Sequence, residues 1–277
     1  MNLNDIRQGE LKEVFDALED AFQVTNTDFY IIGALARDTW YEKSDKPFIG
    51  TKDVDFAVLV GDIDQYQAVK NYLREHKNFK ESRNNQFVML APEGLQIDIL
   101  PFGGEMEIDE AVTVSGPGLN SIHVNGFQEV FDKGTQQMEI RTGHRFKIAT
   151  LPAIVLLKLI AFDDRPEHRI KDARDITNII QNFFEIQPDL VYAHSDLFED
   201  ENDSSTMTEI ASIVIGREIR GIAEPNAELM SRLCQILSNH IAESEKSLFV
   251  RTMVAGGRET VETSVNWLDK VLHGLNK

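Results

Sequence analysis

Hydrophobic positions in the first 60 residues follow two different spacings. Leu11, Val14, Leu18 and Phe22 recur at intervals of three and four, which predicts an amphipathic helix. FYIIG at 29–33 is instead a short apolar run that stops at a glycine, as a buried strand does. Over the first part of the chain this pattern predicts helices at 7–24, 34–43 and 63–76, strands at 29–33 and 53–60, and a Pro- and Gly-containing loop at 44–52.

The pattern changes near residue 150. Before it we predict further strands at 85–90, 95–100, 121–125, 128–132 and 137–148. After it we predict helices at 151–163, 168–184, 207–222, 225–241 and 258–274. Pro152 falls in the first turn of the first of these helices, a position that proline favours. We therefore expect an α+β protein in which an α/β domain (1–150), with a mixed sheet and flanking helices, precedes an all-helical domain (151–277).

Charge narrows the classes of partner. The chain carries 28 basic and 46 acidic residues, a formal charge of −18, which repels phosphate backbones and argues against broad nucleic-acid binding. A nucleic-acid end held locally, or a nucleotide whose charge is carried by metal, remains compatible with it. The single cysteine, Cys234, excludes an intrachain disulfide and a Cys-rich zinc site. No apolar run approaches the roughly 20 residues that span a bilayer, and the N-terminus lacks a signal-peptide stretch, so we expect a cytoplasmic protein without membrane partners.

Two aspartates begin the strand predicted at 53–60. Asp53 and Asp55 are two positions apart, so both project from the same face, where two carboxylates repel unless a proton or cation lies between them. Oxygen ligands without a nearby thiolate or imidazole suit Mg²⁺ or Mn²⁺. The alternative is a pair of solvated acids at a strand edge.

Asp98 lies inside the otherwise apolar run LQIDIL at 95–100. It either faces solvent on the outer side of a sheet or, if its strand lies beside 53–59, completes a cluster of three carboxylates. Such a cluster can hold two divalent ions, which activate an attacking hydroxyl and stabilise a leaving pyrophosphate. Asp98 is then the candidate general base, or the ligand through which the metal activates the nucleophile.

A strand–Gly–helix junction lies upstream, at Gly33 and Ala34. Such a junction presents free backbone N–H groups at a helix N-terminus, where a phosphate can bind, although a plain strand-to-helix turn has the same sequence pattern. Arg37, one turn into the helix, pairs either with a phosphate or with a nearby acid.

The one concentrated basic stretch runs from Lys158 to Arg174. Lys158 lies in an otherwise apolar helix, AIVLLKLIAF, where burial is costly unless the side chain points into a polar cleft. Lys158, Arg165, Arg169 and Asp172 recur at intervals of seven, four and three, which also fits an exposed helix with many salt bridges.

Together, IIGA, DVDFAV and QIDIL resemble the signature of the DNA polymerase β-like nucleotidyltransferase superfamily, in which hG[GS] is followed by DhDh and then by hDh on a neighbouring strand (h, hydrophobic). GALARD resembles the opening of the tRNA-nucleotidyltransferase head domain. LLKLIAFDDRPEHRIKDARDI (156–176) is similar to the K…R…KD..D segment of AbiEii-type nucleotidyltransferases, the toxins of type IV toxin–antitoxin systems.

This resemblance implies a nucleotidyltransferase-type mixed sheet and a helical domain that closes the active-site cleft. It implies that Asp53, Asp55 and Asp98 bind Mg²⁺ or Mn²⁺, that Lys158 contacts the nucleotide phosphates, and that Lys171 and Asp172 lie in the site beside Arg169. A cognate antitoxin is implied as a possible partner. The chain departs from the pattern at Ala34, where the family has glycine or serine, because alanine offers a phosphate only its amide.

We therefore predict transfer of NMP from an NTP to an acceptor hydroxyl, on a tRNA end or a protein as a toxin-like enzyme would, with release of pyrophosphate. A small-molecule, antibiotic-type nucleotidyltransferase is the alternative, and its acceptor suits the charge of −18 better than tRNA does. A third possibility is a lapsed enzyme retained as a nucleotide-binding or interaction module.

Overall fold

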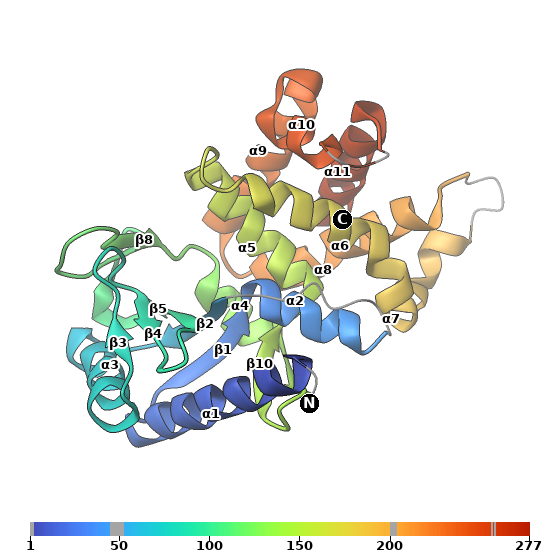
Figure 1. The fold of residues 1–277 in the computed structure, drawn as a ribbon. Helices are drawn as coiled ribbons and strands as arrows, with labels where there is room; N and C mark the ends of the chain where they lie inside the picture. The colour runs from blue at the N-terminus through green and yellow to red at the C-terminus, as the bar shows by residue number, and fades with distance from the viewer. Residues whose placement is uncertain (1–2, 45–52, 200–203, 256, 258) are drawn as a thin grey trace. The chain divides into compact units, whose positions relative to one another are not determined.

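The computed structural model describes residues 3–44, 53–199, 204–255, 257 and 259–277, and of residues 3–10 and 53 only the backbone (Figure 1). Most of the predicted loop at 44–52 therefore lies outside the described residues. Two compact units make up the chain. The first takes in the described residues of Met1–Thr39, Phe48–Phe131 and Thr135–Ala149, and the second those of Trp40–Pro47, Asp132–Gly134 and Thr150–Lys277.

A mixed, seven-stranded sheet forms the centre of the first unit, with the order β3-β4-β5-β2-β1-β10-β9. Its strands are β1 (Asp28–Ile32), β2 (Asp53–Leu59), β3 (Lys80–Glu81), β4 (Val88–Leu90), β5 (Gln96–Phe102), β9 (Thr135–Glu139) and β10 (Arg145–Ala149). β2 pairs antiparallel with β1 and parallel with β5, so the predicted mixed sheet is confirmed. A separate three-stranded sheet holds β6 (Glu107–Ile108), β7 (Ala111–Thr113) and β8 (Ser121–His123), and a short 3-10 helix, η1 (Gly104–Met106), precedes it.

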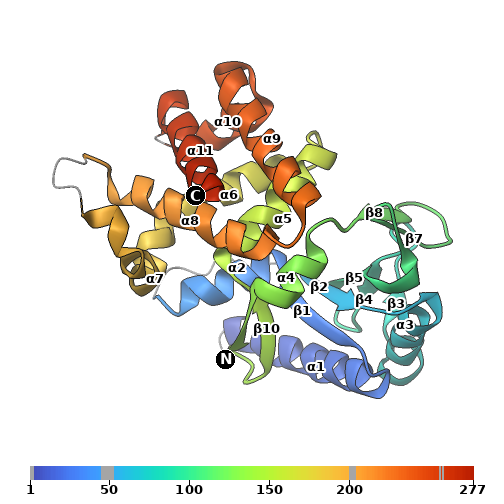
Figure 2. The same ribbon diagram turned by 180° about the vertical axis from the view of Figure 1, so that it is seen from behind.

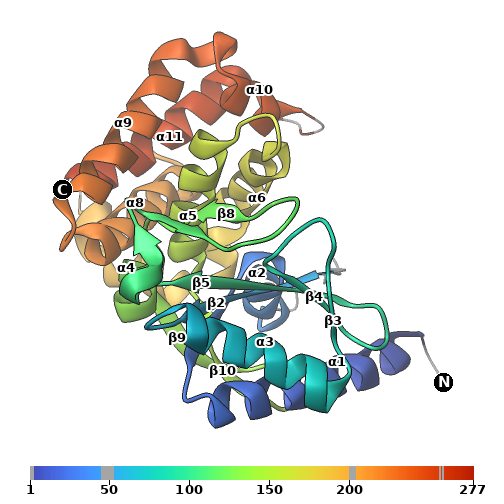
Figure 3. The same cartoon turned by 90° about the vertical axis from the view of Figure 1, so that its left-hand side faces the viewer.

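Helices α1 (Leu3–Val24) and α3 (Ile63–Lys77) pack on the same face of the large sheet and contact each other (Figure 3). Phe15 and Phe22 of α1 contact the ring of Phe56 on β2. Val54 and Val58, two positions before and after Phe56, are buried with it. The apolar side chains of β2 thus pack against α1 and α3, and Asp55 projects from the other face of the strand.

The prediction of a strand at 128–132 is wrong, because these residues belong to helix α4 (Phe127–Lys133). Phe127, Val130 and Phe131 are spaced three and four apart, so a helix places them on one side. There Val130 is buried and both phenylalanines contact Phe102 of β5. The single strand predicted at 137–148 is the hairpin β9–β10, whose turn includes Gly143 at φ +87°.

Helices alone form the regular structure that the described residues show after Ala149, as predicted (Figure 2). They are α5 (Leu151–Asp164), α6 (Ile170–Ile186), α7 (Pro188–Ala193), η2 (Ser195–Phe198), α8 (Met207–Ala223), α9 (Ala227–Glu243), η3 (Ser244–Lys246), α10 (Leu248–Val254) and α11 (Val261–Asn276). The short helices α7 and α10 were not predicted. Thr150 caps α5 by accepting a hydrogen bond from the Ala153 amide. Among the described residues no helix combines the length and the apolar character that crossing a membrane requires.

Candidate active site

One row of paired residues across the large sheet contains two of the three predicted carboxylates. Asp55 of β2 is the register partner of Ile32 in β1 and of Asp98 in β5. Paired residues project from the same face, and neighbouring strands are about 4.8 Å apart. Asp55 and Asp98 are both half-buried, on the face opposite to α1 and α3. The fold therefore brings these two acids together although 43 positions separate them in the sequence.

Asp53 is placed by its backbone alone. It opens β2 and is the register partner of Gln96, two positions before Asp98. Its side chain lies outside the described residues, so the third member of the predicted cluster stays a prediction.

Gly33 lies directly against Asp55. β1 ends at Ile32 and helix α2 (Gly33–Glu42) begins at the next residue, with Gly33 in the left-handed region at φ +67° (Figure 1). A Cβ atom at Gly33 would be 2.1 Å from the Asp55 Oδ2 atom, far inside contact distance. Only glycine allows this approach without displacing the carboxylate. The backbone that begins α2, including the Ala34 amide, therefore adjoins a carboxylate of the candidate site.

Gln96 holds the carboxylate of Asp98. Its Nε2 atom donates a hydrogen bond to the Asp98 Oδ1 atom at 2.9 Å. The two residues are neighbours on one face of the same strand, β5. The sequence analysis did not single out Gln96, although a polar residue two positions before Asp98 in an apolar strand was a visible signal.

Arg37 makes a hydrogen-bonded ion pair with its neighbour Asp38. The Arg37 Nε and Nη2 atoms lie 3.0 and 2.8 Å from the Asp38 Oδ1 atom. Both side chains are almost completely buried, at 6% and 1% exposure. Of the two partners considered for Arg37, the structure thus shows an acid.

Two of the predicted basic residues of the helical unit, Lys158 of α5 and Arg169 before α6, pair with acids of α6. Lys158 Nζ lies 2.6 Å from Asp172 Oδ1 and 2.7 Å from Asp175 Oδ2, and Arg169 Nη1 lies 3.9 Å from Asp172 Oδ2. Burial lowers the pKa of Lys158, but the two carboxylates more than offset this, so the pKa lies above the usual value for lysine. The charge of Lys158 is therefore compensated within its own helix pair, and Asp175 is a partner that the sequence analysis did not assign to the site. Lys171 is exposed on α6.

The predicted site residues thus form two groups, each within one compact unit. Gly33, Ala34, Asp55 and Asp98 belong to the first unit, with the backbone of Asp53. Lys158, Arg169, Lys171 and Asp172 belong to the second. The assignment of both groups to one nucleotide site stays a prediction.

The donor set of the first group fits a hard divalent cation. Two carboxylates stand side by side in the sheet, and oxygen ligands are those that Mg²⁺ and Mn²⁺ prefer. The side chains that the structure describes include no group of three His, Cys, Asp or Glu residues placed to hold a metal ion. Asp53 is not among those side chains, so the described site supplies two of the predicted three ligands.

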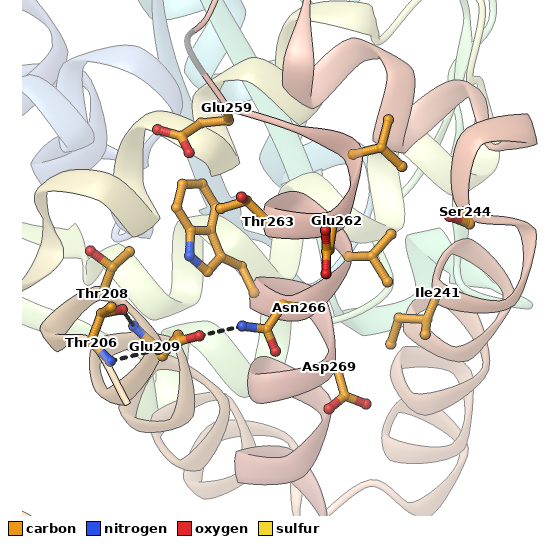
Figure 4. Close-up of a pocket in the computed structure, with 13 residues that line it drawn as sticks. Thr206, Thr208, Glu209, Ile241, Ser244, Glu259, Glu262, Thr263, Asn266 and Asp269 are labelled. Carbon is orange, nitrogen blue, oxygen red and sulfur yellow. Dashed lines mark hydrogen bonds between the residues drawn. The ribbon is translucent and has the colours of Figure 1, made fainter. Parts of the chain in front are cut away.

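A hollow of about 1180 Å³ lies in the helical unit, and none of the predicted site residues lines it (Figure 4). Its lining includes four acidic residues, Glu209, Glu259, Glu262 and Asp269. Glu209 is engaged in the capping box of α8, where it accepts a hydrogen bond from the Thr206 amide at 2.5 Å and another from Asn266. The hydrogen bonds of Glu209 thus serve helix capping. The hollow is not part of the candidate site, because none of the predicted site residues lines it.

Comparison with known proteins gives remote likenesses in structure only. No known protein family matches the chain, and no curated protein matches it. Two solved structures that resemble it are both of ANT(2'')-Ia. The solution structure of this antibiotic-resistance factor has 11% identity and a TM-score of 0.40, and covers 71% of this chain and 97% of its own. The crystal structure of ANT(2'')-Ia in complex with adenylyl-2''-tobramycin has 13% identity and a TM-score of 0.39, and covers 68% and 93%. These likenesses are too remote to assign a function to this chain.

Proposed function

We propose that this protein is a metal-dependent nucleotidyltransferase that transfers NMP from an NTP to an acceptor hydroxyl. One observation carries the proposal: the backbone of Gly33 touches the carboxylate of Asp55, which is paired in register with Asp98. The start of a helix, where anions can bind, and a pair of acids of the kind that can bind a cation therefore lie next to each other in the sheet, which supports the proposal.

In the proposed reaction the acceptor oxygen attacks the α-phosphorus of the NTP. The new O–P bond forms as the bond between the α-phosphorus and the bridging oxygen breaks, and that oxygen leaves with the pyrophosphate. Asp98 accepts the hydroxyl proton, directly or through a water. The amides of Gly33 and Ala34 donate hydrogen bonds to phosphate oxygens and hold the triphosphate in line for attack.

Asp55 and Asp98, with Asp53 as the third predicted ligand, would hold Mg²⁺ or Mn²⁺. When bound, such ions neutralise charge on the triphosphate and make the hydroxyl more acidic. Within this proposal Arg169 and Lys171 add positive charge near the phosphates. Lys158 contributes less positive charge in this proposal, because the carboxylates of Asp172 and Asp175 already pair with it.

For the acceptor we propose a small hydroxylated molecule in preference to tRNA. A formal charge of −18 works against binding of a long polyanion, whereas a small neutral or cationic acceptor carries no such penalty. A protein acceptor, AbiEii-type toxicity and a cognate antitoxin remain the rival proposal. ANT(2'')-Ia is itself described as an antibiotic-resistance factor, but that property belongs to it and not to this chain.

A transfer assay tests the proposal. The protein is incubated with each α-labelled NTP, Mg²⁺ or Mn²⁺, and separately with amino sugars, tRNA or cell protein. We expect pyrophosphate release and label on a small molecule, both abolished by EDTA. Asp55→Asn should lower kcat by about 100-fold or more, because the lost metal ligand supports several kcal/mol of transition-state stabilisation. Asp28→Asn is the matched control, since Asp28 is an exposed acid of the neighbouring strand β1 and should leave kcat unchanged.

Other outcomes discriminate between the alternatives. Label on tRNA or protein, with growth arrest on expression that Asp55→Asn removes, would support the toxin-like enzyme. Calorimetry with NTP and Mg²⁺ that shows binding without turnover would support a nucleotide-binding module, for which Ala34 in place of glycine or serine is the motivating feature. No binding at all would overturn both.

A further inference from the structure

We propose that Gln96 is a positioning residue that orients Asp98 for metal binding and proton transfer. This inference rests on the proposed function and adds a residue to its site. The direct observation is the hydrogen bond of 2.9 Å from Gln96 Nε2 to Asp98 Oδ1.

The geometry of β2 and β5 places this hydrogen bond within the candidate site. Gln96 and Asp98 project from the same face of β5, because they are two positions apart. Gln96 is also the register partner of Asp53, as Asp98 is of Asp55. Gln96 therefore occupies one corner of a four-residue block whose other three corners are the predicted metal ligands.

An amide is well suited to this corner. A fourth carboxylate would repel the acids beside it, and a lysine would compete with a metal ion for them. A neutral amide donates a hydrogen bond to Oδ1 and carries no net charge. The bond restricts rotation of the Asp98 carboxylate, so less side-chain entropy is lost when that carboxylate takes up a ligand or a proton. Gln96 thereby acts on the reaction through Asp98.

Metal binding by the full chain, measured apart from turnover, tests the proposal. Gln96→Met keeps an unbranched side chain of similar length and removes the donor; Gln96→Leu serves if that variant does not fold. We expect the Mn²⁺ dissociation constant, measured by electron paramagnetic resonance, to rise about 10-fold. We expect kcat to fall by a similar factor while KM for the NTP changes less than about twofold, because in this proposal Gln96 acts through the Asp98 carboxylate.

Two controls separate positioning from a structural effect. Gln137→Met makes the same change at an exposed position of β9 in the same sheet and should leave both constants unchanged. In an Asp98→Ala background, where the acceptor of the hydrogen bond is gone, adding Gln96→Met should change the Mn²⁺ dissociation constant less than about twofold. If Gln96→Met instead raised the Mn²⁺ dissociation constant by the same factor with and without Asp98, the proposal would be overturned, because Gln96 would then act through another group.

These measurements distinguish a failure of the proposed role of Gln96 from a failure of the proposed function. A wild-type protein that transfers nucleotides and binds Mn²⁺, with a Gln96→Met variant equal to it in kcat and Mn²⁺ affinity, would overturn the role of Gln96 alone. A wild-type protein that neither binds Mn²⁺ nor transfers a nucleotide would overturn the proposed function and this inference together.

Discussion

The Asp55 carboxylate and the Gly33 backbone adjoin, and this contact limits which residue can stand at position 33. A Cβ there would approach Oδ2 to 2.1 Å and Cγ to 3.0 Å. The carboxylate is the end of a side chain with two rotatable bonds, so it can turn away from an added methyl group. Such a turn would preserve the fold but remove Asp55 from the position beside Asp98.

Gly33→Ala should therefore impair metal binding more than stability. We expect a loss of about 1–2 kcal/mol in the free energy of unfolding, from the left-handed backbone at φ +67°. We also expect at least about a 10-fold rise in the Mn²⁺ dissociation constant, because a direct ligand is displaced. Urea denaturation and Mn²⁺ titration measure the two effects separately.

Gly94→Ala is the matched control, since Gly94 has φ +88° and no atom within 4 Å of the added Cβ. It should lose a similar amount of stability and keep full Mn²⁺ affinity. If Gly33→Ala also kept its affinity, the contact with Asp55 would have no role in the site.

At the scale of the elements, helices α8 and α11 pack with their backbones close together at two glycines. A Cβ at Gly216 of α8 would lie 2.1 Å from the Val271 carbonyl oxygen, and one at Gly274 of α11 would lie 2.1 Å from that of Ile213. Backbone atoms cannot turn aside as a carboxylate can. Each added methyl group would therefore have to push the two helices apart.

Gly216→Ala should destabilise the protein by about 1–3 kcal/mol through overpacking, despite the higher helix propensity of alanine. Gly221→Ala, in the same helix, meets no atom within 4 Å and should instead stabilise by about 0.5–1 kcal/mol. Chemical denaturation of the three proteins gives the comparison. Equal stability of the two variants would mean that the helices are not in close backbone contact.

At the scale of the whole molecule, the distribution of charge bears on how an NTP could be held. A protein of formal charge −18 needs fixed cations near a triphosphate. Arg169 and Lys171 are exposed at the start of α6, whereas Lys158 is only 13% exposed and pairs with two acids. Arg169 also lies 3.9 Å from the Asp172 carboxylate, so among the nucleotide-binding residues predicted at the start of α6 we expect Lys171 to offer the most charge to a ligand.

Lys171→Gln should raise KM for the NTP several-fold at low ionic strength, because one cation less attracts the triphosphate, and this effect should shrink as salt screens it. Steady-state kinetics at two salt concentrations measure it. Lys246→Gln removes another exposed lysine of the same unit, in η3, and should leave KM unchanged. Equal KM values for both variants would place Lys171 outside the nucleotide site.

The sequence by itself determined most of the helices and the strands of the central sheet, because their apolar spacing reflects local geometry. It also predicts that Asp53 and Asp55 share one face of β2, since that follows from the two-residue period of a strand. It failed at α4, where Phe127, Val130 and Phe131 also suit a short strand. Periodicity over so few residues does not separate the two structures.

Only the tertiary structure decided which residues meet. The pairing of Asp55 with Asp98 depends on β5 lying beside β2, and a shift of one residue would have turned Asp98 to the opposite face. The contact of Gly33 with Asp55, the hydrogen bond from Gln96 and the pairing of Lys158 with both Asp172 and Asp175 likewise depend on how elements or rotamers pack. The residue types were visible in the sequence, but their partners were not, because strand order and register are set by long-range packing.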